Sequence, residues 1–420
     1  MNQANDYVSN LKTYYVLAVL HEEAIHDHQC THVFCVVRLS FPTPLECPYK
    51  KHIKLKETVS FDENYVLSVC GTQSDPDFRI GAALSDCSCI VYSIGESLSK
   101  TAVLSHADSP VVGIKFSPTS RNILYTATNK GQVSACDMRA KGKIVAEFKD
   151  NTEDGKLKPL ASFDISSNER LIAGGTEHIG GDAFILFWDI RYINSKLDGR
   201  NSLLGGYWES HMDDVTCLAF HSSKQDVLMS GSTDGLINIF DLTQTSEDSA
   251  LTYSLNTESS VDRLGWLTDE SLWCTTHTHS LQLWECDGAT PYVKFDRQCL
   301  AMLQNEDPDN CYLVRMHVTD TGAQPLVLTG SSSIKGENLR CVNVVKDQLK
   351  TCYDIAENKQ IVRDSWLHQK SGSLVTGGEN GIINIWRQSE MATLQQNPSH
   401  KLLAKIGGKS REKQHRPKPY

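Results

Sequence analysis

The 420-residue sequence has no apolar run long enough to cross a bilayer, which takes roughly 18 residues. The nearest candidates, Tyr14–Leu20 and Val33–Phe41, are short, and the second contains Arg38. The first dozen residues also lack the basic start and apolar block of a secretory signal. These absences predict a protein that neither spans a membrane nor is secreted.

The sequence also lacks any Cys-x-x-Cys pair, although it contains 14 cysteines, and it lacks an Asn-x-Ser/Thr glycosylation acceptor. The nearest match to that acceptor, Asn397-Pro398-Ser399, is excluded by its proline. Scattered cysteines of this kind are typical of reduced thiols that pack as small buried apolar groups. The expected location is therefore the cytoplasm, the nucleus or both.

The net charge of −10 is unevenly distributed along the chain. Residues 388–420 carry seven Lys or Arg against two Glu, or +5, and residues 1–51 carry four basic and five acidic groups, or −1. Residues 52–387 therefore carry −14. An acidic body of this size disfavours sequence-specific nucleic-acid recognition and suits neutral or basic protein partners.

One unit of alternating strands and tight turns recurs along the chain. Its clearest copy is Ser210–Leu242, in which Val215–Phe220, Val227–Gly231 and Leu236–Asp241 read as antiparallel strands between Gly/Asp turns. Further copies lie at 65–94, 105–139, 160–191, 260–286, 311–345 and 360–387. Seven units spaced by about 40–45 residues predict an all-β, seven-bladed propeller, which protects its sheet edges by radial repetition.

The predicted third strand of each unit carries one large or apolar anchor residue, and these are Tyr92, Cys136, Trp188, Phe240, Trp284, Val344 and Trp386. Together with "DAFILFWDIR", "SHMDDVTCLAFH" and "SGSTDGLINIFD", this pattern resembles the WD-repeat family over about 60–390. The resemblance implies that the last blade takes its outer strand from the start of the chain, for which "HIKLKETV" at 52–59 is the candidate.

These observations predict three regions in the chain. A seven-bladed WD40-type β-propeller is expected at 52–387, after an N-terminal extension at 1–51 that is expected to be poorly ordered. A basic tail at 388–420 contains Gly, Pro and few apolar residues, so we expect it to be disordered.

The resemblance also implies a chain of polar groups that stiffens each blade: a turn His, a strand Ser or Thr, a tight-turn Asp and a third-strand Trp. Only the fourth unit comes close, with His211, Ser230 or Ser232, and Asp234, but Phe240 stands where the Trp would be. The last unit has Trp386 without a turn His. We expect His211, Ser230, Asp234, Phe240 and Trp386 to be structural, and blade rigidity to depend mainly on apolar packing.

Two segments point to partner binding. In WD proteins that act as substrate receptors of cullin-type ubiquitin ligases, a strand ending like Trp188-Asp189-Ile190-Arg191 helps dock the ligase adaptor, and Arg191 would supply a bidentate charged contact. The alternative is that Trp188 packs between blades while Asp189 and Arg191 only end the strand. The segment "CDMR" at 136–139 resembles this ending but lacks the tryptophan.

The second segment is the basic tail, which is typical of a nuclear-import signal or a loose nucleic-acid contact, or else only aids solubility. Its candidate import residues are Lys409, Arg411, Lys413, Arg416 and Lys418. Partner-specific contacts are also predicted at three insertions, Gln73–Arg79, Glu177–Asp182 and Asp320–Gln324, because long loops often carry function.

The strongest hint of catalysis is "HEEAIHDHQCTHVFC", His21–Cys35. A zinc hydrolase needs histidines four residues apart on one helix face, but His21 and His26 are five apart, about 140° around the helix. An ad hoc site from His28, Cys30, His32 and Cys35 lacks a second ligand pair with finger spacing downstream. We therefore assign no catalytic, cofactor-binding or metal-binding residue.

Other enzyme signatures fail as well. In "GSTDG", 231–235, Thr233 occupies the position of a nucleophilic serine, and in "GGKS", 407–410, the first glycine of a phosphate loop is replaced by Leu403. The sequence thus predicts a non-enzymatic intracellular scaffold for protein–protein interactions, a monomer within larger complexes. A ligase substrate receptor, a nuclear assembly factor and a metal-dependent hydrolase stay open as alternatives.

Overall fold

The computed structural model describes residues 53–61, 63–106, 109–150, 157–191, 203–319, 324–333 and 336–388. All of these residues fall within Tyr49–Tyr420, the second of the chain's two units. The extension at 1–51 with its His/Cys cluster, and the tail beyond Gln388, lie outside the described residues.

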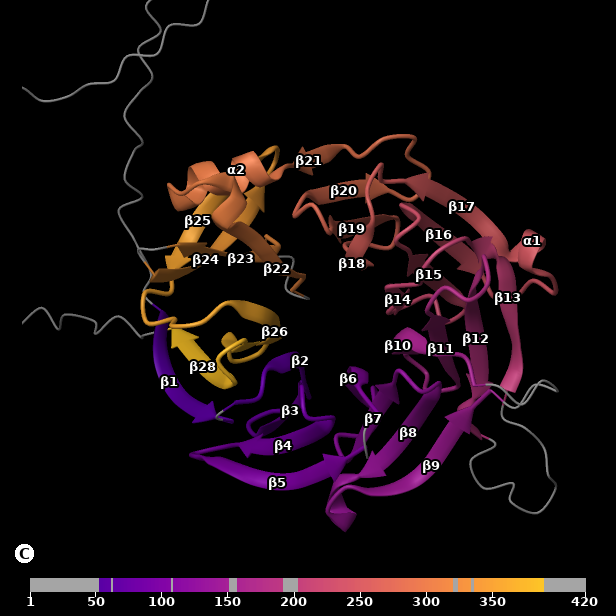
Figure 1. Cartoon of the computed structure of the whole chain (residues 1–420), viewed down its shortest axis with the longest axis horizontal. Helices are drawn as coiled ribbons and strands as arrows, with labels where there is room; N and C mark the ends of the chain where they lie inside the picture. The colour runs from indigo at the N-terminus through magenta and orange to yellow at the C-terminus, as the bar shows by residue number, and fades with distance from the viewer. Residues whose placement is uncertain are drawn as a thin grey trace, which may run out of the picture. The chain divides into compact units, whose positions relative to one another are not determined.

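The second unit is a ring of seven four-stranded antiparallel sheets, so the predicted seven-bladed propeller is confirmed (Figure 1). Blades one to three are β2 (Val66–Gly71), β3 (Phe78–Leu84), β4 (Ser88–Ile94), β5 (Leu98–Ser105); β6 (Val111–Phe116), β7 (Ile123–Thr128), β8 (Gln132–Asp137), β9 (Lys143–Lys149); and β10 (Leu160–Ile165), β11 (Leu171–Thr176), β12 (Ala183–Asp189), β13 (Leu203–His211). Each blade begins with the strand nearest the ring centre.

Blades four to six are β14 (Cys217–Phe220), β15 (Val227–Gly231), β16 (Leu236–Asp241), β17 (Leu251–Asn256); β18 (Val261–Trp266), β19 (Ser271–Thr276), β20 (Leu281–Glu285), β21 (Val293–Phe295); and β22 (Cys311–His317), β23 (Leu326–Ser333), β24 (Gly336–Val345), β25 (Gln348–Asp354). Two short helices, α1 (Glu247–Ala250) and α2 (Arg297–Gln304), are inserted before β17 and after β21. Among the described residues, no helix is long and apolar enough to span a membrane.

Blade seven closes the ring with both ends of the described chain. It consists of β26 (Val362–His368), β27 (Ser373–Gly378), β28 (Ile382–Gln388) and, as its outer strand, β1 (Ile53–Ser60). β1 runs antiparallel to β28, with Ile53 opposite Gln388 and Ser60 opposite Ile382. The closing strand predicted at 52–59 is therefore present.

In six of the seven blades the anchor position on the third strand is marked by an irregularity in strand pairing. In these six blades the outer strand gains one residue just before the anchor, as between Ile239 and Phe240. In blade six that shift falls between Cys341 and Val342, and Val342 is fully buried. The sequence assignment of Val344 as anchor is thus wrong by two residues, because the long β23–β24 hairpin displaces the repeat.

Apolar packing between neighbouring blades forms the core. Trp188, Trp284 and Trp386 are among the largest fully buried side chains. One cluster joins Tyr125 and Phe148 of blade two to Trp188 of blade three. Burial of a large aromatic side chain contributes about 1.5–3 kcal/mol, so a series of such clusters around the ring holds the blades together.

Candidate interaction surfaces

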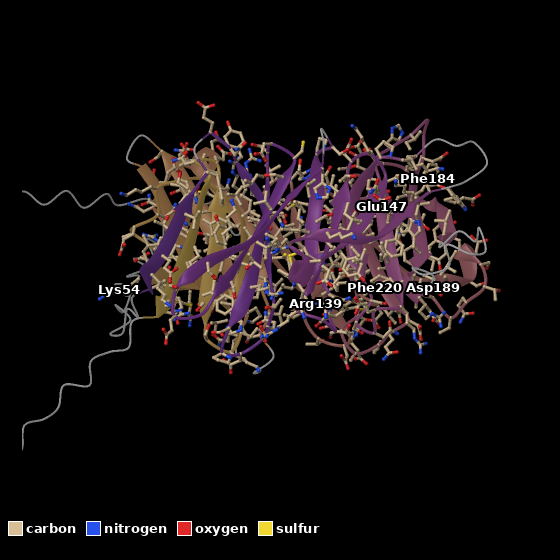
Figure 2. The ribbon with its side chains drawn as sticks, turned by 90° about the horizontal axis from the view of Figure 1, so that it is seen from below. Lys54, Arg139, Glu147, Phe184, Asp189 and Phe220 are labelled. Atoms are coloured by element: carbon tan, nitrogen blue, oxygen red, sulfur yellow. The ribbon has the colours of Figure 1, made fainter. Side chains whose placement is uncertain are left out.

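The ring presents two faces, which we name from Figure 2. The lower face carries the hairpins between first and second strands and the ends of the third strands, including Arg139 and Asp189. The upper face carries the turns between second and third strands and the loops that lead into the next blade; it includes Phe184.

The polar residues of blade four form an internal chain of hydrogen bonds. His211 is only 2% exposed; its Nδ1 lies 3.0 Å from Asp234 Oδ2 and its Nε2 lies 2.7 Å from Ser230 Oγ. Burial alone would raise the pKa of Asp234, but the bonds from His211 and from the backbone N–H groups of Leu236 and Met212 lower it below its usual value. The three side chains stiffen the blade and offer little surface to a partner.

The polar chain ends differently in blade seven. Trp386 Nε1 donates to Thr376 Oγ1 at 2.9 Å, whereas Phe240, at the equivalent position of blade four, has no donor and is fully buried. Both residues lie inside the blades. The residues that the sequence predicted to be structural therefore belong to the interior of the fold.

A charged network crosses the central channel, and the sequence did not predict it. The inner strands line a channel of about 630 Å³. Asp364 of blade seven, whose side chain is fully buried, lies 3.0 Å from Arg315 of blade six and 3.2 Å from Arg263 of blade five. Asp364 also accepts hydrogen bonds from Val69 N and Ser68 Oγ of blade one. One carboxylate thus links four blades.

A second carboxylate plays the same part on the other side of the channel. Asp164 of blade three pairs with Lys115 of blade two and accepts a 2.8 Å hydrogen bond from Phe220 N of blade four. Each acid here has a basic partner and backbone donors, so the network explains ring closure and needs no ligand.

The predicted docking motif is mostly buried. Trp188 is fully buried and donates from Nε1 to Lys149 O at 3.1 Å, and the Asp189 side chain is 4% exposed. Arg191 is 66% exposed, but its Nε and Nη2 already bond both oxygens of Asp189, and these bonds lower the pKa of that carboxyl. Trp188 therefore offers no side-chain surface to a partner. Of the three residues, only Arg191 exposes its side chain to a partner.

The upper face of blades three and four carries an exposed aromatic patch, which we define as Ile179, Phe184, Trp208 and Met212. The rings of Phe184 and Trp208 meet edge to face at 5.0 Å, and the Lys158 ammonium lies within 6 Å of both ring centres. Trp208 is 39% exposed and Met212 75% exposed. Large apolar side chains exposed together on a water-facing surface mark interaction sites.

Local backbone structure places this patch. Ile179 and Asp182 bridge a tight turn whose central residues, Gly180 and Gly181, both have positive φ, which glycine adopts without strain. His211 pairs with Ala183, so Met212 and Asp182, one residue beyond each, are neighbours. The predicted insertion Glu177–Asp182 therefore supplies part of the patch.

The rim of the aromatic patch is acidic. Asp182, Glu209 and Asp213 are exposed, and Glu177 is half-buried and accepts a hydrogen bond from Asn129. The Lys158 ammonium, which lies against the rings, is neutralised by buried Asp150 at 2.7 Å. The patch thus combines apolar area with surplus negative charge.

Sequence reasoning missed the aromatic patch, since Phe184 and Trp208 come from different strands. The signal available was an aromatic residue at an outward position beside the predicted insertion. Of the other insertions, Gln73–Arg79 lies on the lower face, and most of Asp320–Gln324 lies outside the described residues.

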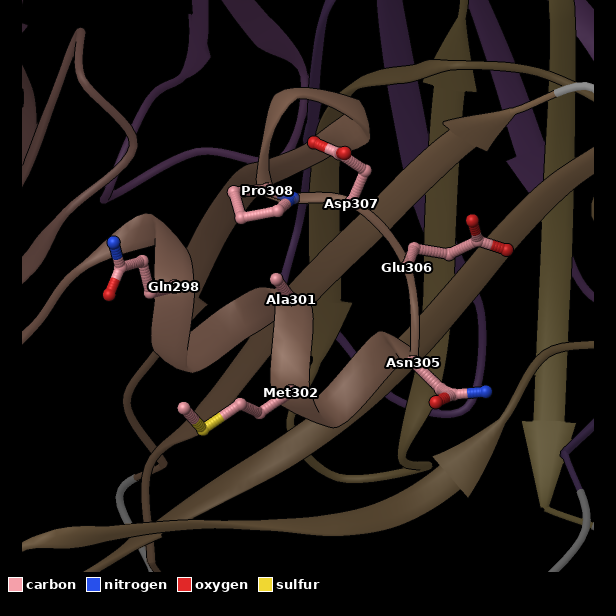
Figure 3. Close-up of a pocket in the computed structure, with 7 residues that line it drawn as sticks. All are labelled: Gln298, Ala301, Met302, Asn305, Glu306, Asp307 and Pro308. Atoms are coloured by element: carbon pink, nitrogen blue, oxygen red, sulfur yellow. The ribbon is translucent and has the colours of Figure 1, made fainter. Parts of the chain in front are cut away.

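A shallow recess surrounds α2, an insertion that the sequence analysis did not anticipate (Figure 3). Its volume is about 510 Å³, and it is lined by Gln298, Ala301, Met302, Asn305, Glu306, Asp307 and Pro308. These residues include no nucleophile–base pair. Over the part of the chain that the structure describes, no three His, Cys, Asp or Glu side chains gather as metal ligands.

Comparison with known proteins agrees with the seven-bladed ring. Residues 204–241 match the WD domain, G-beta repeat family. An uncharacterized WD repeat-containing protein of Saccharomyces cerevisiae is 29% identical over 71% of this chain and 72% of its own length. The WD repeat-containing protein GTS1 of Arabidopsis thaliana is 26% identical over 66% of this chain and 69% of its own length.

The WD repeat-containing protein 89 homolog of Dictyostelium discoideum is 23% identical over 44% of this chain and 52% of its own length. The order of the third and fourth units also resembles that of WD repeat-containing protein 89. Seven blades, the matched repeat and these relatives agree with the family resemblance read from the sequence. The chain belongs to the WD-repeat β-propeller family.

Proposed function

We propose that this protein is a non-enzymatic intracellular scaffold that binds another protein through the aromatic patch on its upper face. WD-repeat propellers typically mediate protein–protein interactions and are generally not enzymes. The observation that carries the proposal is the exposure of Trp208 and Met212 beside Ile179 on rigid strands and a tight turn. Tryptophan is enriched among the residues that contribute most to protein interfaces.

The chemistry of the patch defines the partner that it fits. An apolar side chain would cover the Phe184 and Trp208 rings, and Lys or Arg residues beside it would meet Asp182, Glu209 and Asp213. The expected partner is therefore a protein segment with an apolar anchor flanked by basic residues. The acidic body of the propeller would favour its approach.

Affinity purification with mass spectrometry tests the proposal. The bait is the full chain, compared with Trp208→Ala and with the matched control Tyr253→Ala, which removes an aromatic ring of similar exposure from the outer strand β17. A specific partner is expected to be lost with Trp208→Ala and kept with Tyr253→Ala. Equal recovery by all three baits would contradict the proposal.

A ligase substrate receptor is the second candidate, and it is supported by the exposure of Arg191 alone. Arg191→Ala would leave the buried Asp189 carboxylate without its guanidinium, so Arg191→Lys, which keeps the charge but loses the fork, is the cleaner variant. Loss of the ligase adaptor from a normally folded Arg191→Lys protein would support this function. Unchanged co-purification would exclude it.

The remaining alternatives depend on residues outside the described part of the chain. A nuclear assembly factor predicts that deletion of 398–420 moves the protein from the nucleus to the cytoplasm. A metal-dependent hydrolase predicts stoichiometric zinc in the purified chain, which is lost on deletion of 1–51. An unchanged distribution or a zinc-free protein would exclude each in turn.

A further inference from the structure

The lower face of blades one to three carries five arginines, Arg79, Arg121, Arg139, Arg170 and Arg191, which we call the arginine arc. Arg79 Nη1 donates to Arg121 O and to Asn122 Oδ1, both at 2.9 Å. Met138 N donates to Asn122 O at 2.8 Å, which places the turn of Arg139 beside the same hairpin. Three of the arginines are thereby held next to one another on blades one and two.

Glu169 continues the arc from blade two to blade three. Its carboxylate accepts a 2.8 Å hydrogen bond from the Tyr125 hydroxyl and another from Thr119, both of blade two. Arg170 follows it in the chain, and Arg170 O accepts from Ile190 N at 2.9 Å, next to Arg191. The five arginines thus form one continuous surface.

The arc is positively charged although the propeller as a whole is strongly negative. In blades two and three, the segments 117–122, 137–143, 166–170 and 189–191 hold six Lys or Arg against three acids, or +3. All three acids are engaged, Asp137 by Arg139, Asp189 by Arg191 and Glu169 by the two hydroxyls. Arg121 and Arg170 are exposed and form no ion pair within the described residues.

The crowding of positive charge also bears on the pKa of Arg79. Burial, followed by the neighbouring charge of Arg121, lowers the pKa of that guanidinium, while Asp137 opposes the shift. The part of this pKa shift that comes from Arg121 has a physical cause, the positive potential around these hairpins. Such a potential favours a bound anion.

Acidic residues bound the arc on both sides. Asp75 and Asp77 lie in the lower hairpin of blade one, and Asp226 and Asp241 lie on the lower face of blade four. A nucleic-acid strand carries a phosphate at every nucleotide, so it would bring charge against these carboxylates as it crossed the face. A peptide can carry Asp and Glu opposite the arginines and uncharged residues opposite the carboxylates. This difference favours a peptide ligand.

We propose that the arginine arc binds an acidic segment of a protein partner, rich in Asp and Glu and extended along blades one to three. Each guanidinium offers a planar fork that fits a carboxylate with two parallel hydrogen bonds. Arg121 and Arg170 provide the first contacts, and Arg139 and Arg191 share their forks between their own Asp and the ligand. This surface lies on the face opposite to the aromatic patch and carries the opposite charge, so the proposal is independent of the proposed function.

Fluorescence anisotropy with the full chain tests the arc. The probe is a labelled peptide in which Asp and Glu alternate with Gly and Ser, compared with its Asn/Gln counterpart and with a single-stranded RNA of equal charge. The variant is Arg121→Gln/Arg170→Gln, which leaves no carboxylate without a partner. The matched control is Lys130→Gln/Lys359→Gln, two exposed upper-face residues whose loss changes the net charge equally.

At low ionic strength the acidic peptide is expected to bind about tenfold more tightly than the Asn/Gln peptide, and the arginine variant is expected to lose about tenfold in affinity. The lysine variant is expected to bind as the unmodified chain does. Three outcomes would overturn the proposal: equal binding of acidic and neutral peptides, equal losses in both variants, or displacement of the peptide by RNA that binds more tightly.

Discussion

Replacement of Asp364 by asparagine tests how the ring is closed. The carboxylate accepts hydrogen bonds from Val69 N at 2.8 Å and from Ser365 N at 2.9 Å, in addition to its two arginine partners. Asparagine keeps the size of the side chain but removes its charge. Arg263 and Arg315 would then share the channel without the counter-charge that holds blades five, six and seven to blade one.

The expected cost follows from the burial of the three groups. Breaking a buried ion pair costs about 3–5 kcal/mol, but the arginine side chains are 25% and 33% exposed, so channel water offsets part of this. We expect Asp364→Asn to lower the free energy of unfolding by about 2–4 kcal/mol. For 336 residues, 52–387, the unfolding entropy converts this into a fall in Tm of about 3–6 °C.

The pKa of Asp364 determines how the effect of Asp364→Asn on stability changes with pH. Burial alone would raise the pKa of Asp364, but Arg315, Arg263 and the two backbone donors lower it below its usual value. A carboxyl whose pKa is lowered by folding stabilises the fold above its unfolded pKa, about 3.9, and loses this as pH falls through the folded value. The difference in Tm between the native chain and Asp364→Asn is therefore expected to shrink below about pH 4.

Thermal unfolding monitored by circular dichroism measures both effects. Asp262→Asn is the matched control, since Asp262 is 38% exposed and lies 3.9 Å from Arg263. It is expected to change the free energy of unfolding by less than about 1 kcal/mol. If Asp364→Asn proved no more destabilising than Asp262→Asn, or if its effect did not fade at low pH, the closure argument would be refuted.

Three further predictions concern the blades and the aromatic patch. Trp386→Phe loses the bond to Thr376 and is expected to cost about 0.5–1.5 kcal/mol in urea unfolding; no loss would mean that the indole N–H contributes nothing. His211→Ala leaves Asp234 and Ser230 without their shared partner and is expected to cost about 2–4 kcal/mol by the same assay, whereas a cost near zero would contradict its role as a strut. Trp208→Ala is expected to change stability by less than about 1.5 kcal/mol, because much of the ring is exposed; a larger loss in Tm would show that the residue is structural.

The fold was predictable because its signals are local and repeated. Alternating strands with Gly/Asp turns recur seven times, and the closing strand shows its own alternation, which the structure matches in the half-buried and exposed positions of Ile53–Ser60. The prediction failed at Val344, where the longer hairpin between β23 and β24 shifted the repeat and no tryptophan marked the anchor.

The candidate surfaces were less predictable, since they join residues far apart in the chain. Arg263 and Asp364 are separated by 101 residues and meet only because blades five and seven both border the channel. Phe184 and Trp208 meet across neighbouring strands of blade three. The "WDIR" motif identified the right strand end, but not that Trp188 and Asp189 are buried, because burial depends on the packing of blade two.

Site-specific photo-crosslinking is the most direct test that the aromatic patch is the binding site. A photoreactive phenylalanine at Met212, which is 75% exposed within the patch, is compared with the same group at Leu204, which is 57% exposed on the outer strand of the same blade. The proposed function predicts a light-dependent covalent adduct with a partner protein from position 212 and none from position 204. Adducts from position 204 alone, or equally from both positions, would contradict it.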